Sequence, residues 1–305
     1  MASSSHPVSD FLRANGAYSY VLVAIVLWAT TAAASKILLT GGLTSTQVVF
    51  FWSLLSIAPL FIAVLWQKKL HLHRAYTLRD YLRFAAVGGL GVFLYNFLLL
   101  SAFARLAAQE AFLINYLWPI MVVIFGIIIL RDTFTLRTAF ALLLSFAGVA
   151  IIAMHGNLFS LAFSDPLGVL FAVAGAVCYG LFGALDKKAG GDKIVNMLVY
   201  SMPAAAVSFL VMMFSDGFPA LSLPQFLGLM WLGVAAGAIG FTCWLTGLSG
   251  LDTARASNLV FLTPFLSLVF IRIFVGEAIL LSSVGGLMLI LCGIIVSSLK
   301  ARRRK

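Results

Sequence analysis

The sequence predicts an all-α integral membrane protein, with ten transmembrane helices in two inverted five-helix repeats and both termini in the cytoplasm. Three observations lead to this prediction: the composition, the length of the apolar stretches and the distribution of basic residues between them. Of the 305 residues, 62% are apolar or aromatic and 10% are charged, whereas a globular domain carries about 25% charged residues. A single core of this size could not cover so much apolar surface. The composition excludes a soluble or disordered chain, and the three cysteines, each alone in an apolar stretch, exclude a disulfide-stabilised secreted module.

Ten continuous apolar stretches are long enough to cross a bilayer as helices, which requires about 20 residues each. They are far longer than the strands of a membrane barrel, which have about ten residues. No small-residue cleavage site follows the first stretch, so we expect it to be retained as a helix behind a polar tail at residues 1–17. The stretches run from Tyr18 to Leu39, Thr46 to Trp66, Tyr81 to Ala104, Ala111 to Leu130, Leu136 to Met154, Pro166 to Leu185, Ile194 to Phe214, Pro224 to Leu248, Ala256 to Val275 and Ile279 to Leu299.

Basic residues predict the orientation, because cytoplasmic loops carry an excess of Lys and Arg. With the N-terminus inside, 17 of the 20 basic residues fall on the inner side, and only Lys36, Arg105 and Arg272 fall on the outer side. The net charge of +10 therefore reflects orientation and, at the tail 300–305, attraction to anionic lipid. It does not indicate a nucleic-acid partner.

An internal repeat divides the chain into residues 18–155 and 165–299. The spacing between matched residues is 151 positions near the start of each half and 145 farther on. The matched pairs are Trp28 with Tyr179, Lys36 with Lys187, Pro119 with Pro264, Asp132 with Glu277, and Gly148 with Gly293. Because each unit contains an odd number of helices, the second unit must enter the membrane upside down relative to the first.

Four prolines lie deep inside the predicted helices: Pro59, Pro119, Pro203 and Pro264. A proline in a helix interior removes a backbone hydrogen bond and clashes with the preceding turn. We therefore expect kinks at matched positions in the two repeats.

Three sequence strings resemble a known family: AIVLWAT from Ala24, INYLWP from Ile114, and FLTPFLSLVFIRIFVGEAI from Phe261. The chain resembles the drug/metabolite transporter superfamily, specifically its EamA-type exporters, and the first two strings are similar to bacterial exporters of aromatic amino acids. The resemblance implies a multi-pass exporter of the bacterial-type inner membrane, with a central cavity lined by helices one, three, four, six, eight and nine. Phe261-Leu262-Thr263-Pro264 departs from the Tyr-Leu-Trp-Pro pattern of the first half, so we expect the cavity to be more aromatic on one repeat.

All ten carboxylates and all four histidines lie at span ends or in loops. Ion-coupled carriers usually hold an ionisable residue inside the membrane, so we expect a facilitator, with proton coupling as the alternative. A membrane enzyme needs an acid and base pair, a metal set or an activated nucleophile at membrane depth. We therefore expect no catalytic activity, no metal and no cofactor; a channel or a non-transporting receptor fits two kinked repeats less well than a carrier does.

Aromatic and amide side chains within the spans are the candidates for substrate binding. Aromatic faces can stack on a flat solute, while amides, which are costly to bury in hydrocarbon, can bind its ammonium and carboxylate groups. The same residues could instead pack in the core or face lipid. The candidates are Trp28, Tyr95, Asn96, Asn115, Tyr116, Trp118, Tyr179, Trp244 and Asn258.

Four charged residues are candidates for the mouths of the pathway. Lys36 and Lys187 fall at opposite ends after inversion, where they either extend to the membrane interface or attract a substrate carboxylate. Glu110 and Arg255 occupy equivalent positions on opposite faces and are candidates for ion pairs in a closed gate.

These patterns predict an exporter of aromatic and other neutral amino acids that works by alternating access. The alternatives are aromatic or cationic drugs and nucleobase-like metabolites. The expected partners are a small-molecule substrate and the lipid bilayer, with no nucleic acid. A monomer is sufficient for this function, and the sequence leaves the oligomeric state open.

Overall fold

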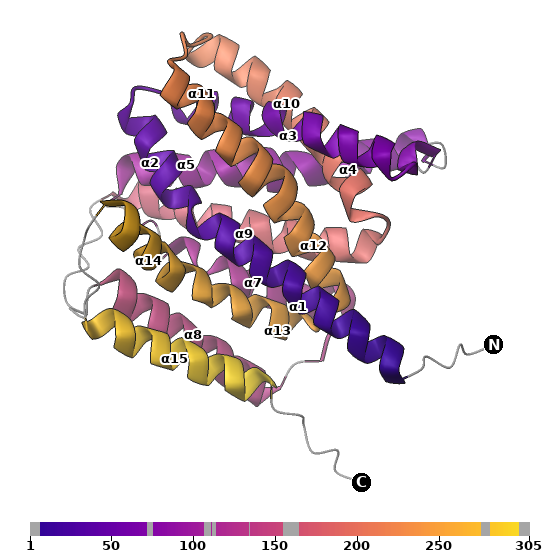
Figure 1. Ribbon diagram of the computed structural model, residues 1–305, viewed down its shortest axis with the longest axis vertical. Coiled ribbons are helices and arrows are strands. Elements are labelled where there is room, and N and C mark those ends of the chain that lie inside the picture. The colour runs from indigo at the N-terminus through magenta and orange to yellow at the C-terminus, as the bar shows by residue number, and fades with distance from the viewer. Residues whose placement is uncertain are drawn as a thin grey trace.

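The computed structural model describes residues 7–71, 76–106, 111, 114–133, 135–154, 165–275 and 281–298. This part of the chain is helical throughout its regular structure and contains no strand, which confirms the predicted all-α class. The helices pack side by side in one bundle, with α8 and α15 at one edge and α3 and α10 towards the other (Figure 1). The first half of the chain forms α1 (Pro7–Ala29), α2 (Thr31–Thr40), α3 (Ser45–Trp66), α4 (Leu78–Gly88), η2 (Gly89–Leu94), α5 (Tyr95–Arg105), α7 (Trp118–Phe125), η3 (Gly126–Leu130) and α8 (Leu136–Ala153). The second half forms α9 (Pro166–Ala189), α10 (Lys193–Ser215), α11 (Leu223–Met230), η4 (Trp231–Gly240), α12 (Phe241–Gly250), α13 (Thr253–Leu259), η5 (Val260–Leu262), α14 (Thr263–Val275) and α15 (Leu281–Ser298).

Six helical stretches of the described residues are long and apolar enough to cross a membrane. Three shorter apolar helices match further predicted spans, and the ninth predicted span, Ala256 to Val275, falls on α13, η5 and α14. The multi-pass class is therefore supported, while the count of ten spans and the side of the termini stay predictions. The six stretches are Gly16–Thr40, Ser45–Trp66, Leu78–Arg105, Pro166–Ala189, Lys193–Ser215 and Leu223–Gly250, and the shorter ones are Trp118–Leu130, Leu136–Ile152 and Val284–Ser297.

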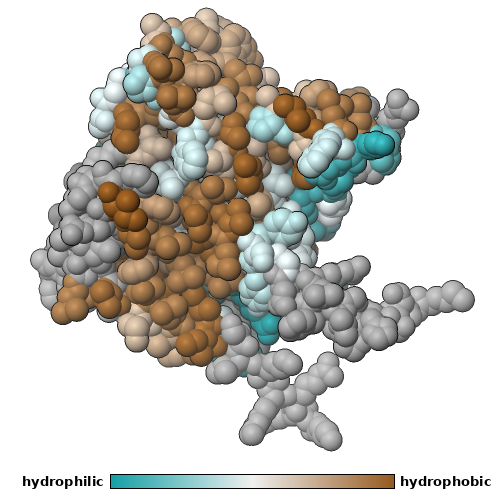
Figure 2. All heavy atoms as spheres, in the orientation of Figure 1, coloured by the Kyte–Doolittle hydropathy of each residue, from teal (hydrophilic) through white to brown (hydrophobic). Residues whose placement is uncertain are grey.

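The outer surface of the bundle is strongly apolar. Large side chains such as Leu143, Phe214 and Ile62 are more than half exposed, and apolar residues cover much of the face shown in Figure 2. Hydrophilic residues gather at one side of that face (Figure 2). A soluble monomer rarely exposes so large an apolar surface, so this surface faces lipid.

Corresponding helices of the two halves pack against each other in antiparallel pairs. Thr44, just before α3, donates a hydrogen bond to Asp216, just after α10, so the start of α3 lies at the end of α10. In the same way, Gly148 of α8 packs on Ile290 of α15, and Gly293 of α15 packs on Ser145 of α8. A shift of 145 residues, the spacing of the internal repeat, converts each of these two contacts into the other. This pairing is the arrangement expected of inverted repeats.

The central helices follow the same symmetry. α1 packs on α12 as α9 packs on α5, and α1 packs on α14 as α9 packs on α7. Because α1 corresponds to α9, each repeat contributes an equivalent wall to the centre of the bundle.

The four prolines occupy two kinds of position. Pro59 lies inside α3 and Pro203 inside α10, as predicted. Pro119 and Pro264, however, lie in the first turns of new helices: α7 follows a turn at residues 116–117, and α14 follows directly on η5. A proline in the first helical turn loses no hydrogen bond and has the correct φ for the helix. At these two sites the change in the helix therefore comes before the proline, and the predicted kinks stay predictions.

The basic residues mark the two ends of the bundle. We call the basic end the one where α9 and α12 end and where α4, α10 and α13 begin; contacts of Lys69 with Asp192 and of Lys187 with Thr253 hold these segments together. At the opposite end, α2 and α5 end and α9 begins. There Arg105 pairs with Asp165 at 3.0 Å, and this hydrogen bond holds the pKa of the Asp165 carboxyl below its ordinary value. The described basic residues at the basic end are Lys68, Lys69, Arg79, Arg83, Arg131, Arg137, Lys187, Lys188, Lys193 and Arg255.

The α8–α15 contact gives a direct test of the packing. A Cβ atom at Gly286 would lie 2.6 Å from the carbonyl oxygen of Gly148, whereas one at the neighbouring Gly285 meets no atom within 4 Å. Overpacking costs about 1–3 kcal/mol, so Gly286→Leu is expected to lower the Tm of the detergent-solubilised protein by several degrees. Gly285→Leu is the matched control and should leave the Tm unchanged; equal Tm values for the two variants would contradict this packing.

Candidate functional site

A cavity lies at the centre of the bundle between the two repeats. It includes about 740 Å³ of empty space, part of it open to the surroundings. Its lining residues lie from the middle of the bundle towards the opposite end, in α1, α2, the first half of α3, α5, the segment before α7 and the first residue of α7, and α9, α12, η5 and α14. The structure brings seven of the nine predicted substrate-binding residues to this cavity: Trp28, Tyr95, Asn96, Asn115, Tyr116, Trp118 and Tyr179.

Aromatic rings form the inner wall of the cavity. The ring of Tyr179 lies 4.5 Å from that of Tyr95 and 4.7 Å from that of Trp118, measured between centroids. Trp28 packs edge-on against Phe241 at 5.4 Å, and its Nε1 donates a hydrogen bond to the Ala236 carbonyl. These contacts hold the rings in fixed orientations, so their faces are ready for stacking on a ligand.

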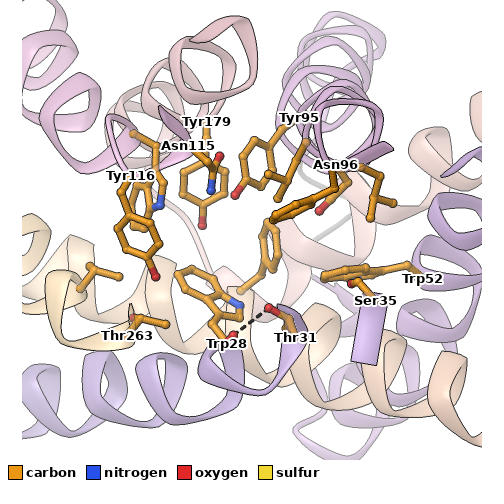
Figure 3. Close-up of a pocket in the computed structure, with 16 residues that line it drawn as sticks. Trp28, Thr31, Ser35, Trp52, Tyr95, Asn96, Asn115, Tyr116, Tyr179 and Thr263 are labelled. Atoms are coloured by element: carbon orange, nitrogen blue, oxygen red, sulfur yellow. Dashed lines mark hydrogen bonds between the residues drawn. The ribbon is translucent and has the colours of Figure 1, made fainter. Parts of the chain in front are cut away.

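Polar atoms without protein partners lie within this aromatic wall. Asn115 lies between the rings of Tyr116, Tyr179 and Tyr95, and Trp28 is on the facing side (Figure 3). In the part of the chain that the structure describes, the Asn115 Oδ1 atom and the Tyr179 hydroxyl are buried and make no hydrogen bond. An unsatisfied buried polar group costs about 1–3 kcal/mol. A ligand that donates hydrogen bonds here would remove that cost.

The described lining contains no charged side chain. Asn96 bonds its own helix through Nδ2 and the Val92 carbonyl at 2.8 Å, while Thr31 bonds the Trp28 carbonyl at 2.7 Å (Figure 3). The cavity thus presents amide, hydroxyl and aromatic groups. Such a site suits a solute with zero net charge, because a lone charge is costly to desolvate without a counter-charge.

The cavity is more aromatic on one repeat than on the other, as expected from the sequence. Its aromatic residues in the first repeat are Trp28, Trp52, Tyr95, Phe103, Tyr116 and Trp118, against Tyr179 and Phe241 in the second. Thr263 occupies the position in the second repeat that Trp118 holds in the first. This substitution leaves the hydroxyl of Thr263 in the lining opposite the ring of Tyr116 (Figure 3).

Two predicted binding residues lie outside the cavity. Trp244 is fully buried behind the wall, with its ring 5.2 Å from Trp118 and 5.9 Å from Trp28. Asn258 lies between helices, where its Oδ1 accepts a 2.6 Å hydrogen bond from Ser145 of α8. Trp244 therefore supports the wall from behind, and Asn258 joins α13 to α8. Their assignment as direct cavity residues is wrong because each faces a neighbouring helix.

Sequence reasoning missed several lining residues, among them Thr31, Ser35, Trp52, Phe241 and Thr263. Thr31 and Ser35 follow Trp28 at spacings of three and seven residues, so one helical face carries all three. That spacing was a usable signal. Trp52 extends the lining to the second predicted span, which the resemblance does not include.

The four predicted mouth charges have different outcomes. Lys187 is half-buried at the basic end, away from the cavity, where its Nζ donates hydrogen bonds to Thr253 Oγ1 at 2.7 Å and to the Leu251 carbonyl at 3.1 Å. In this conformation its Nζ is held by these two partners and does not face the cavity. Arg255 is partly exposed in the first turn of α13, at the basic end. Lys36 belongs to α2, but its side chain lies outside the described residues, as does all of Glu110.

Comparisons with known proteins agree with this architecture. An uncharacterized transporter of Clostridium kluyveri is 24% identical over 295 residues, which cover 92% of each chain. The aromatic amino acid exporter YddG of Ancylobacter novellus is 25% identical over 180 residues, covering 58% of this chain and 62% of that protein. A solved crystal structure superimposes with a TM-score of 0.81 at 22% identity, covering 95% of this chain and 98% of the other, and so shares its fold.

The family comparison covers both halves of the chain. The profile of the EamA-like transporter family matches residues 15–154 and again residues 166–299. Because these two matches span most of the sequence, the chain belongs to the EamA-like transporter family.

Proposed function

We propose that this protein exports aromatic and other neutral amino acids across a bacterial-type inner membrane by alternating access. The observation that carries the proposal is the central cavity, in which the buried Oδ1 of Asn115 and the hydroxyl of Tyr179 lie unpaired among aromatic rings. The ammonium group of an amino acid donates hydrogen bonds that these oxygens can accept. Hydrogen bonds to charged groups contribute about 1.5–3 kcal/mol each.

Zero net charge is the main selectivity argument. The described lining has no carboxylate to balance a cation and no basic group to balance an anion. A zwitterion brings both charges together and needs only polar groups to orient it. The rings of Trp28 and Trp118 add stacking surface for an aromatic side chain. The sequence likeness to the exporter YddG of Ancylobacter novellus supports the same substrate class.

The proposal includes orientation and mechanism. The basic end is the cytoplasmic end, because positively charged residues are retained there. Ten spans in two inverted repeats then place both termini in the cytoplasm, and one chain encloses the cavity without a second copy. The pathway opens to the periplasm when the cavity is accessible from the opposite end, and to the cytoplasm when the repeats exchange conformations.

Counterflow in proteoliposomes tests this function. Vesicles loaded with unlabelled tryptophan should accumulate labelled tryptophan transiently and saturably, and phenylalanine and threonine should compete. A dicationic drug should not compete, because the described lining offers no counter-charge. Absence of counterflow would indicate a channel or a non-transporter, and stronger competition by the drug than by phenylalanine would replace the amino-acid proposal with a drug exporter.

Energy coupling can be tested in the same vesicles. No titratable carboxylate or histidine lines the described cavity, so the transporter is expected to act as a facilitator. An imposed pH gradient with equal tryptophan on both sides should therefore produce no net accumulation. Uphill uptake that collapses when a protonophore is added would contradict facilitated transport and establish proton coupling.

A further inference from the structure

One face of α9 continues from the cavity to the basic end. Tyr179, Phe182 and Asp186 share this face, because residues three and seven positions apart lie above one another on a helix. Tyr179 lines the cavity. Phe182 and Asp186 lie beyond it, and their exposed fractions are 0% and 1%. The side chains that would line an extension of the cavity towards the basic end are therefore buried, and the cavity is closed on that side.

A buried polar cluster closes that end. The Oδ2 of Asp186 lies 2.6 Å from Nζ of Lys193, whose exposed fraction is 8%. The Oδ1 of Asp186 accepts hydrogen bonds from the Tyr200 hydroxyl at 2.9 Å and from Asn196 Nδ2 at 3.1 Å. The Oδ1 of Asn196 is buried and makes no hydrogen bond to any described residue. The cluster thus holds one full ion pair and one free acceptor.

Stability alone does not explain why this ion pair is buried. The desolvation of a buried ion pair often exceeds the attraction between its charges, so well-packed apolar residues would serve a static core as well. Its members also come from both sides of one tight hairpin, α9 and α10, at the mouth of the bundle. A pair that is costly to bury and lies close to water can instead have a role in a second conformation, in which its two residues move apart.

Phe182 isolates this cluster from the cavity. Its ring packs against Tyr179 at 5.9 Å on the cavity side and against Tyr200 at 5.5 Å on the cluster side. It also rests directly on Gly91 of η2, where a Cβ atom would overlap the ring. Phe182 thus separates the cavity from the polar cluster around Asp186.

In the first repeat, the equivalent helix face is open to the cavity. Trp28, Thr31 and Ser35 line the cavity on its way to the opposite end, and the 151-residue repeat matches them with Tyr179, Phe182 and Asp186. One repeat therefore presents this face to the cavity while the other buries it. If the repeats exchange conformations, the buried face becomes the open one.

We propose that Tyr179, Phe182 and Asp186 line a second access route to the cavity, closed in this conformation, and that Asp186 and Lys193 form a binding subsite for an amino acid arriving from the basic end. The inference rests on the proposed function for the identity of the ligand. The ammonium group of the ligand takes the place of Lys193 beside Asp186, and its carboxylate takes the place of Asp186 beside Lys193. Each charge keeps a partner during this exchange, so the subsite opens without leaving an isolated charge.

The access route is tested by thiol labelling of the full-length protein in membrane vesicles. The background replaces the three cysteines, Cys178, Cys243 and Cys292, with alanine, and Phe182→Cys introduces the reporter. A membrane-impermeant maleimide applied at the basic end should label it slowly, and saturating tryptophan should increase the rate. Adding Asp186→Asn and Lys193→Gln together removes both charges without stranding either, and should raise the labelling rate without tryptophan by at least about threefold as the closed state loses population. No labelling under any of these conditions would overturn the route.

Two further measurements separate this proposal from simpler explanations. Lys188→Gln changes an exposed charge on the same turn of α9 and should leave the labelling rate unchanged. An equal increase would mean that any loss of charge opens the route, and would contradict the proposed role of the Asp186–Lys193 pair. With Phe182 intact, Asp186→Asn/Lys193→Gln should raise the tryptophan KM at least about tenfold for transport from the basic end and not from the opposite end. An unchanged KM from the basic end would overturn the subsite. If no amino acid is transported while labelling still responds to the double variant, the access route stands and the proposed substrate class is wrong.

Discussion

Asn115→Leu is expected to reduce tryptophan transport efficiency by at least about tenfold, the effect of losing one charge-assisted hydrogen bond worth about 1.4 kcal/mol or more. Leucine has the branched shape and the number of heavy atoms of asparagine, so the change mainly removes polarity. The Oδ1 of Asn115 has no described protein partner, and the Tyr95 hydroxyl that bonds the Asn115 side chain lines the cavity, where water can replace the bond. The folded protein should therefore keep its Tm while its KM for tryptophan rises. The measurement is initial-rate counterflow alongside thermal unfolding in detergent.

Asn258→Leu is the matched control for this prediction. Asn258 is also a buried amide, but its Oδ1 accepts a 2.6 Å hydrogen bond from Ser145 and lies outside the cavity. Its replacement leaves the Ser145 hydroxyl without this partner, which costs about 1–3 kcal/mol, and should lower the Tm with little change in KM. A lower Tm for Asn115→Leu with unchanged KM would show that Asn115 is structural and that the substrate binds elsewhere.

The contrast between these two asparagines shows what the sequence could predict about the site. An amide within an apolar stretch must find a polar partner, and this reasoning selected both residues. Whether the partner is a ligand or another helix depends on which way the side chain faces. For Asn258 the partner is Ser145, on a helix that is 113 residues away in the sequence. Such long-range pairing has no local signal.

The helices themselves were largely predictable, because hydropathy and length decide whether a stretch can lie in lipid. The breaks within them were not. Pro119 lies in the interior of a long apolar stretch, yet the backbone turns at Tyr116 and Leu117 and α7 begins at Trp118. A proline is compatible with both a kink and a helix start, and the difference depends on the turn that precedes it. That turn cannot be predicted from the apolar composition of the stretch.

Asp186 illustrates a second limit. The sequence placed it with the carboxylates at span ends or in loops and gave no sign of a partner, whereas the structure buries it against Lys193 and Tyr200. The spacing of seven residues between Asp186 and Lys193 spans a helix end and a tight loop. The pair forms only because Gly190 and Gly191 reverse the chain with positive φ angles of 67° and 74°, and this geometry favours glycine.

Gly180→Leu is expected to abolish the folded transporter, because a side chain as large as leucine has no space where α9 crosses α7. A Cβ atom at Gly180 would lie 2.7 Å from the carbonyl carbon of Met121 and 2.9 Å from the amide nitrogen of Val122. These are backbone atoms, which cannot rotate away as a side chain would. Accommodation requires the two helices to separate, and that separation would break the 4.7 Å contact between the Trp118 and Tyr179 rings in the cavity wall. The variant should be absent from the monodisperse peak in detergent size-exclusion chromatography.

Gly183→Ala provides the control one turn farther along α9. A Cβ atom there would meet Leu248 at 3.4 Å and Val122 at 3.6 Å, both through side-chain atoms at ordinary contact distance. This variant should elute as the unmodified protein does and retain tryptophan counterflow. Gly180→Ala should fall between the two: overpacking by one methyl group costs about 1–3 kcal/mol, so the protein should fold with a lower Tm. Its transport should also weaken, because moving α9 away from α7 shifts Tyr179, whereas full activity and an unchanged Tm for Gly180→Ala would mean that the helices do not cross this closely.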